Sequence, residues 1–350
     1  MNAGRPTSTQ TRWWWIAGAF GITSIVVLVA AGVGAVEIAP RDIFASAWSR
    51  IPLVGGDSPL NPRDDAIVWQ IRMPRIALGL LVGSMLSIAG TAYQGVFRNP
   101  LADPYLLGAG AGAGLGATIA IVYLPRASIG FVDLLPIAAF VGAIVGVSLA
   151  YLLGYTVRSG RTSVTLILAG VAIAAFLTAV QTFIQQRETE SLREVYGWIL
   201  GSLNTAGWSD VTLVAPYVLV CSGVIFGYRR LLDVLSVGEA EAATLGVEPR
   251  KLRLVVIGFA TLGTAAVVAV SGLIGFVGII IPHTVRLLTS TSYRVIVPLS
   301  FLLGGAFLVF ADIIARTAQA PAEIPIGVVT ALIGAPFFAV VLRRSKGIVS

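Results

Sequence analysis

Residues 254–285 read LVVIGFATLGTAAVVAVSGLIGFVGIIIPHTV, a run of apolar and small side chains without a single Asp, Glu, Lys or Arg. A helix that crosses a bilayer needs about 20 apolar residues, so this run is too long for one crossing. Near its middle, Ser271 to Gly275 (SGLIG) contains two glycines, which interrupt helices readily. We therefore predict two short membrane helices joined at this break, in an integral membrane protein.

The rest of the chain has the same character. Hydrophobic residues make up 56% and charged residues 12% of the 350 residues, about half the charged share of a soluble domain, which excludes an ordinary soluble enzyme. Further charge-free stretches of spanning length are 13–36, 76–97, 104–125, 134–157, 162–186, 211–228, 295–311 and 324–342. We predict one all-α transmembrane domain over 1–350 with ten spanning helices.

The distribution of Lys and Arg predicts the orientation. Basic residues gather on the cytoplasmic side of membrane proteins, and cytoplasmic N- and C-termini place 15 of the 24 basic residues there. The longest outer loop is then 37–75, and the longest inner loop is 229–253. A cleaved signal peptide is the alternative for the first stretch, although its apolar run is long enough to span.

The membrane stretches lack the groups that most membrane chemistry needs. Apart from Asp103 and Asp312 near helix ends, no carboxylate falls at membrane depth, which disfavours a secondary transporter and an intramembrane enzyme. The chain has one Cys, one His and no G-x-x-x-x-G-K-[ST] loop. We predict no catalytic residue, no metal site, no bound cofactor and no nucleic acid partner.

Several strings of residues, taken in order, resemble one family. They are Ile71 to Arg75 (IRMPR), Arg98 to Pro104 (RNPLADP), Gly197 to Leu203 (GWILGSL) followed by Trp208, Gly272 to Arg286 (GLIGFVGIIIPHTVR), and Ala311-Asp312 with Arg316, Glu323 to Gly327 (EIPIG) and Gly334 to Phe337 (GAPF). Together they resemble the FecCD-type permease family, the membrane subunits of type II ABC importers for iron-siderophores, haem and cobalamin.

The resemblance implies a fold, partners and a cargo. It implies the type II ABC importer permease fold, in the cytoplasmic (inner) membrane of a prokaryote. It also implies a second permease copy, for which we favour a homodimer, two ABC ATPase subunits that use ATP and Mg, and an extracytoplasmic substrate-binding protein. Among the family's cargoes we favour a ferric siderophore, then cobalamin, then haem.

The inner loop 229–253 is where the resemblance places the coupling to the ATPase. Residues 236–247 read as a short helix that ends at Gly246, with Pro249 preventing its continuation. The candidate coupling residues are Gly238, Glu239, Glu241, Ala242, Leu245, Gly246, Val247 and Arg250. A solvated amphipathic turn is the alternative interpretation.

Two neighbouring segments are candidates for the pathway and its gate. Thr178, Gln181, Thr182 and Gln185 have the i, i+3, i+4, i+7 spacing of one helix face. The segment 195–209 is too short and Gly-rich to span, and it corresponds to the family's gating helix; Trp198, Leu200 and Ser202 are its candidate residues. Helix packing is the alternative role for the polar face.

Three arginines lie on the predicted outer face, against the general bias of basic residues. In the family, outer arginines receive glutamates from the binding protein, and Arg72, Arg75 and Arg316 are the candidates here. Arginine suits this task because its planar fork can hold a carboxylate with two hydrogen bonds. The alternative is that these side chains anchor helix ends or pair with Asp64, Asp65 or Asp312.

Overall fold

The computed structural model describes residues 13–34, 36, 38–50, 58–124, 128–129, 132–156 and 163–345. The long helices are α1 (Trp13–Gly32), α4 (Met73–Phe97), α5 (Ala109–Tyr123), α6 (Leu134–Thr156), α7 (Ser163–Arg187), α9 (Trp208–Val237), α11 (Pro249–Ser271), α12 (Val277–Leu288), α13 (Tyr293–Thr317) and α14 (Ile326–Ser345). Shorter helices are α2 (Pro40–Ser49), α3 (Pro62–Ala66), η1 (Ile67–Arg72), η2 (Pro104–Leu107), η3 (Thr189–Ser191), α8 (Leu192–Ile199) and α10 (Glu239–Thr244). Strands β1 (Ser128–Ile129) and β2 (Val132–Asp133) form one antiparallel hairpin.

The helical architecture predicted from the sequence is confirmed. Seven of the described helices are long and apolar enough to cross a membrane, and α5, α12 and α14 are shorter apolar helices. These ten helices coincide with the ten predicted stretches, and the predicted break after Ser271 separates α11 from α12. The number of crossings and the side of the termini stay predictions, and residues 1–12 and 346–350 lie outside the described part of the chain.

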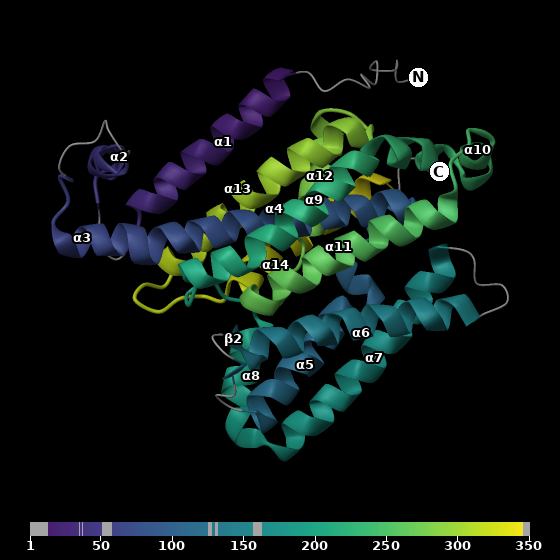
Figure 1. Ribbon diagram of the computed structural model, residues 1–350, viewed down its shortest axis with the longest axis horizontal. Helices are drawn as coiled ribbons and strands as arrows, with labels where there is room; N and C mark the ends of the chain where they lie inside the picture. Colours follow the sequence, from purple (N-terminus) through teal and green to yellow (C-terminus); the bar gives the residue numbers. More distant parts are fainter. Residues whose placement is uncertain are drawn as a thin grey trace.

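The helices form two groups, which Figure 1 shows one below the other. In the larger group, α4 packs against α13, α11, α9 and α12 and is buried along almost its whole length. The smaller group consists of α5, α6 and α7, and α6 packs it against α11. The spans α1, α6, α7 and α9 bury only a minority of their residues, so they form the periphery that lipid or another subunit can cover.

Several of these helices touch backbone to backbone. A Cβ atom at Gly90 of α4 would overlap the carbonyl oxygen of Gly278 in α12. A Cβ atom at Gly112 of α5 would overlap the carbonyl oxygen of Gly142 in α6 in the same way. Lipid tails are as apolar as the helices, so no hydrophobic driving force brings helices together within a membrane. Close backbone packing of this kind is therefore a main source of helix association.

The second spanning helix begins far earlier than its predicted start at residue 76. It is continuous from Pro62 to Phe97, so much of the predicted outer loop 37–75 is helical. Its η1 segment is a π-helix, in which the Met73 amide donates to the carbonyl of Val68. The wider turn accommodates Pro74, which has no N–H to donate and whose ring would crowd a regular helix.

Candidate functional site

A buried ion cluster joins three elements at one end of the bundle. Arg75 of α4 donates to Asp312 of α13, with Nη2 2.8 Å from Oδ1 and Nε 3.0 Å from both carboxylate oxygens. The same guanidinium donates to Glu323, at 2.8 Å from Nη1 to Oε1 and 2.9 Å from Nη2 to Oε2. The planar fork of arginine presents donors to both carboxylates in a fixed geometry, so this side chain ties α4 and α13 to the segment that precedes α14.

The cluster changes the acidity of its most exposed member. Hydrogen bonds from Arg75 stabilise the charged form of Glu323 and lower the pKa of that carboxyl group below its ordinary value. The Glu323 side chain is 35% exposed, whereas that of Asp312 is 4% exposed. Glu323 is therefore the member of the cluster that an outside partner can reach.

The other two candidate arginines hold the C-terminal end of α1. Arg72 donates to the carbonyl oxygens of Ala31, at 2.6 Å, Gly32, at 3.0 Å, and Val36. Arg316 donates to the carbonyl oxygen of Ala30 at 2.5 Å. The last carbonyls of a helix have no partner within it and carry partial negative charge, so two cations cap this end well.

All three candidate arginines are thus engaged within the chain. Arg72 is 4% exposed and Arg75 is 8% exposed. This geometry supports the anchoring role for these side chains, with Asp312 as the shared acidic partner. Glu323, which the sequence reasoning did not consider as a partner, completes the cluster.

Next to the cluster, three separate segments meet through their backbones. The Ser202 amide donates to the carbonyl of Ser271 at 2.9 Å, at the end of α11. The amides of Ile326 and Gly327, at the start of α14, donate to the carbonyls of Gly201 and Leu200 at 3.2 and 3.0 Å. We call the residues 200–202, 271–273 and 326–327 the junction. It attaches the middle of the predicted gating segment 195–209 to both α11 and α14.

Glycines make this junction possible. Gly201 and Gly272 have φ values of 72° and 68°, which side chains with a Cβ rarely adopt. A Cβ atom at Gly272 would overlap the carbonyl oxygen of Trp198, and one at Gly327 would overlap that of Leu200. The three segments therefore lie closer together than any larger residue would permit.

The helix of the predicted gating segment is displaced from its expected position. The prediction placed it at 195–209, whereas α8 covers Leu192–Ile199 and residues 200–207 are not helical. The left-handed conformation of Gly201 turns the chain toward the junction. Trp198 packs against the small residues of α5 and α11, and Leu200 is exposed. A cavity of about 140 Å³ touches both the junction and the Arg75 cluster, so the two form one site.

The predicted polar face of α7 divides between two environments. Gln181 and Gln185 are buried, and a Cβ atom at Gly114 of α5 would lie 2.9 Å from Oε1 of Gln181. Thr178 and Thr182 are exposed on the free side of the helix. The four residues form one stripe, as predicted, but the stripe lies along the edge of the contact between α5 and α7.

The inner loop is shorter than predicted because helices extend into it from both sides. α9 continues to Val237, and α11 begins at Pro249, so α10 does not continue past this proline, as predicted. Between them, α10 ends near Gly246, whose φ of 78° terminates it as predicted. Gly238 precedes α10 at a point where a Cβ atom would overlap Glu241.

The candidate coupling residues divide into buried and exposed groups. Ala242 is buried and Val247 packs against the core, while Glu239 forms an ion pair with Arg253. Arg250 donates to the Tyr155 hydroxyl at 2.9 Å. The exposed members include Glu241, Gly246 and Leu245, the last with 70% of its surface accessible. Leu245 is therefore an exposed apolar side chain at the end of α10.

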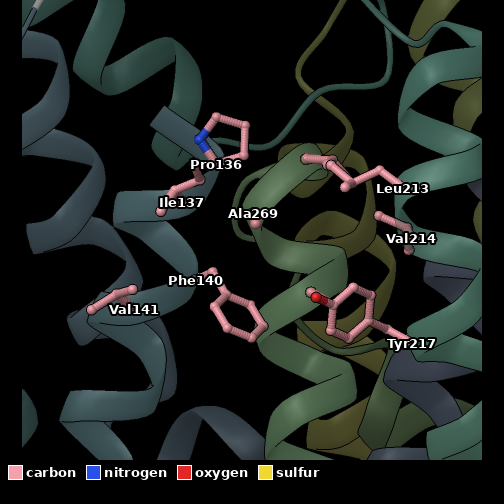
Figure 2. Close-up of a pocket in the computed structure, with 10 residues that line it drawn as sticks. Pro136, Ile137, Phe140, Val141, Leu213, Val214, Tyr217 and Ala269 are labelled. Carbon is pink, nitrogen blue, oxygen red and sulfur yellow. The ribbon is translucent and has the colours of Figure 1, made fainter. Parts of the chain in front are cut away.

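A second cavity, of about 330 Å³, lies between α6, α9 and α11 (Figure 2). Apolar side chains line it, and Phe140 and Tyr217 face each other across it with ring centres 5.9 Å apart. Such a lining suits hydrocarbon and offers no charge to a chelate. Among the described residues, no group of three or more His, Cys, Asp or Glu side chains could hold a metal ion.

Comparison with known proteins extends over nearly the whole chain. The model of the FecCD transport family matches residues 22–344. The cobalamin import system permease protein BtuC of Halobacterium salinarum is 38% identical, covering 94% of this chain and 95% of the relative. The Fe(3+)-citrate import system permease protein YfmD of Bacillus subtilis is 35% identical, covering 82% of this chain and 84% of the relative.

A solved structure supports the same relationship in three dimensions. It is an inward-facing conformation of a transporter assigned to the metal-chelate type of ABC transporters. The TM-score is 0.81 at 29% sequence identity, and the alignment covers 95% of this chain and 100% of the other. The family match includes every candidate site residue described above.

Proposed function

The chain belongs to the FecCD transport family, and from this premise we propose that a homodimer of it forms the membrane pathway for a ferric siderophore. As a member of this family, the chain is the permease subunit of a type II ABC importer and not itself a catalyst. A separate ATPase hydrolyses ATP, with Mg, and a binding protein delivers the cargo. We place the complex in the cytoplasmic membrane of a prokaryote.

A chelated cargo is supported by the number of metal ligands in this sequence together with the cargo of two of the relatives. The named relatives import cobalamin and Fe(3+)-citrate, and in both a metal is enclosed by an organic ligand. This chain has one His and one Cys, too few soft or imidazole ligands for handling bare transition metals. A metal that travels inside a chelate needs no such ligands from the permease. Cobalamin and haem are the alternative cargoes.

Uptake by the assembled importer tests this choice. The permease, its ATPase and its binding protein would be reconstituted in vesicles, and uptake of a radiolabelled ferric siderophore compared with that of cobalamin and haem. We expect ATP-dependent uptake of the siderophore alone. Uptake of cobalamin or haem in its place would overturn the choice of cargo but not the family membership.

The exposed end of α10 is the proposed contact with the ATPase. We expect Leu245→Arg to leave the permease folded, because this side chain is 70% exposed, and to abolish most cargo-stimulated ATP hydrolysis. Interface residues that act as hot spots contribute about 2 kcal/mol or more, and a loss of that size weakens association about 30-fold. The measurement is ATP turnover of the reconstituted complex, and Ser209→Arg, an exposed change at the other end of α9, is the control.

We propose that the exposed side of α7, which carries Thr178 and Thr182, lines the translocation pathway. We also propose that α8 and the junction together form the gate of this pathway. In a Cys221→Ala background, Thr182→Cys should react rapidly with a membrane-impermeant maleimide in at least one transport state. Gln181→Cys should react slowly, because residue 181 is only 7% exposed and faces α5. Equal reactivity of the two cysteines in every state would contradict this assignment.

We also propose that the outer face around Arg75 receives the binding protein. Because Glu323 already occupies one side of the Arg75 fork, an incoming carboxylate must exchange with it. Glu323→Gln should then raise the docking affinity about fivefold at low salt, or roughly 1 kcal/mol, by weakening the internal competitor. The measurement is binding-protein affinity in nanodiscs at two salt concentrations. Glu188→Gln, an exposed change outside the cluster, is the control, and an unchanged affinity would exclude the exchange.

A further inference from the structure

Helix α2 lies across the direction of the spanning helices. Figure 1 shows α2 end on, whereas α1 and α4 run across the same view. It follows the C-terminal end of α1 and precedes α3, the start of the long helix that contains α4. If α1 and α4 cross a membrane, the axis of α2 is roughly parallel to the membrane surface.

The two faces of α2 differ sharply. Ile43 is 4% exposed and Ser46 is fully buried against the rest of the protein. On the opposite side, Phe44 is 64% and Trp48 is 49% exposed, and their rings stack with centres 6.4 Å apart. The Arg41 side chain, 87% exposed, falls on the same side as these rings because residues 41, 44 and 48 are spaced i, i+3, i+7, and its Nε lies 3.4 Å from Asp42 Oδ1 in an exposed ion pair.

A set of polar contacts holds α2 in this orientation. Trp69 Nε1 donates to Ser46 Oγ at 3.0 Å, and Ser46 Oγ donates to Asp65 Oδ1 at 3.0 Å. Arg50, directly after α2, donates to Asp65 and places its guanidinium 4.5 Å from the centre of the Trp69 ring. Because Ser46 and Arg50 bond the C-terminal half of α2 to the long helix, α2 is held with its aromatic rings on the side away from that helix. The exposure of Phe44 and Trp48 is a fixed property of the fold.

We propose that α2 is an interfacial helix that inserts Phe44 and Trp48 into the boundary between headgroups and acyl chains of the outer leaflet. Aromatic side chains with a basic residue on a short amphipathic helix suit this boundary, where an apolar ring can be buried and a cation meets lipid phosphate. The partner is the phospholipid surface. This inference needs the helices to span a membrane but does not depend on the cargo.

The position of α2 favours lipid over a protein partner. It contacts α1, a span whose residues are mostly exposed and therefore border lipid. In Figure 1, α2 lies at the edge of the molecule opposite α7 and α8, the elements that we assign to the pathway and gate. The binding-protein contact that we propose is around Arg75, beyond Trp69 on the long helix. The aromatic side of α2 is opposite the face that is bonded to that helix, and it has the leaflet beside it.

Depth-dependent fluorescence quenching tests the proposal on the full chain in phosphatidylcholine nanodiscs. In a Cys221→Ala background, Phe44→Cys and Trp48→Cys would each be labelled with bimane, and Thr205→Cys, on the exposed loop after α8, is the control. We expect nitroxide near the headgroups to quench the labels at 44 and 48 several-fold more strongly than nitroxide at the chain ends. Aqueous iodide should quench them several-fold less than the label at 205.

Two outcomes would overturn the proposal. One is quenching by iodide at 44 and 48 as strong as at 205, with no effect of either nitroxide lipid, which would place the aromatic face in water. The other is protection of positions 44 and 48 from iodide only when the binding protein is added, which would identify the face as a protein-docking surface. Because both residues are exposed, cysteine at either position leaves the core of the fold unchanged.

Discussion

Arg75→Glu is expected to prevent most of the permease from folding. The change removes the cation that holds Asp312 and Glu323 and puts a third carboxylate beside them. Breaking a buried ion pair by removal of one partner costs about 3–5 kcal/mol, a large part of the stability of an ordinary domain. Thermal unfolding in detergent, followed by size-exclusion chromatography, measures the loss. We expect little monodisperse protein at temperatures where the wild type remains folded.

Two further variants separate charge from geometry in this cluster. Arg75→Lys keeps the positive charge but loses the fork, so its loss of stability should be intermediate. The double change Arg75→Glu with Glu323→Arg restores one opposite-charge pair and should recover part of the stability. Wild-type stability of Arg75→Glu would show that the cluster does not hold these helices together and would return Arg75 to a role in docking alone.

The second large effect is expected from one added methyl group. Gly272→Ala forces a Cβ atom onto the carbonyl oxygen of Trp198, and it does so at φ 68° and ψ −165°. That backbone region is essentially restricted to glycine and costs about 1–3 kcal/mol for other residues, before any steric overlap is counted. We expect a loss of thermal stability and of transport together, because the junction carries both the fold and the proposed gate.

Gly275→Ala is the matched control for this change. Gly275 lies three residues further along the same break between α11 and α12, and a Cβ atom there would meet nothing within 4 Å. It should be close to neutral in stability and in transport. Equal behaviour of the two variants would mean that the junction is looser than its hydrogen bonds indicate.

Some of this architecture could be predicted because it depends on local features of the sequence. The break after Ser271 follows from a run too long for one helix with glycines near its middle, and the structure confirms it. The start of the second span was predicted 14 residues too late for a related reason. The charge-free stretch begins only after the last of five charged residues, which are Arg63, Asp64, Asp65, Arg72 and Arg75. Charges that are paired or exposed are nevertheless compatible with a helix that continues beyond the apolar layer.

The candidate site was harder to predict because its contacts join distant parts of the chain. Arg75 and Asp312 are 237 residues apart, and Arg75 and Glu323 are 248 residues apart, so no local pattern relates them. The spacing of Thr178, Gln181, Thr182 and Gln185 correctly predicts a common stripe on α7. It cannot show that α5 covers one edge of that stripe, because helical periodicity says nothing about the neighbouring element.

The separation of the Arg75 partners along the chain has a consequence for biosynthesis. Membrane proteins are made from the N-terminus, so α4 is completed long before α13 and the segment with Glu323 leave the ribosome. Until then Arg75 has no acidic partner from these elements, and it is exposed to water, lipid headgroups or assembly factors. Closure of the cluster marks the moment at which almost the whole polypeptide has been synthesised. A truncated chain that lacks α13 and Glu323 keeps Arg75 without these two acidic partners.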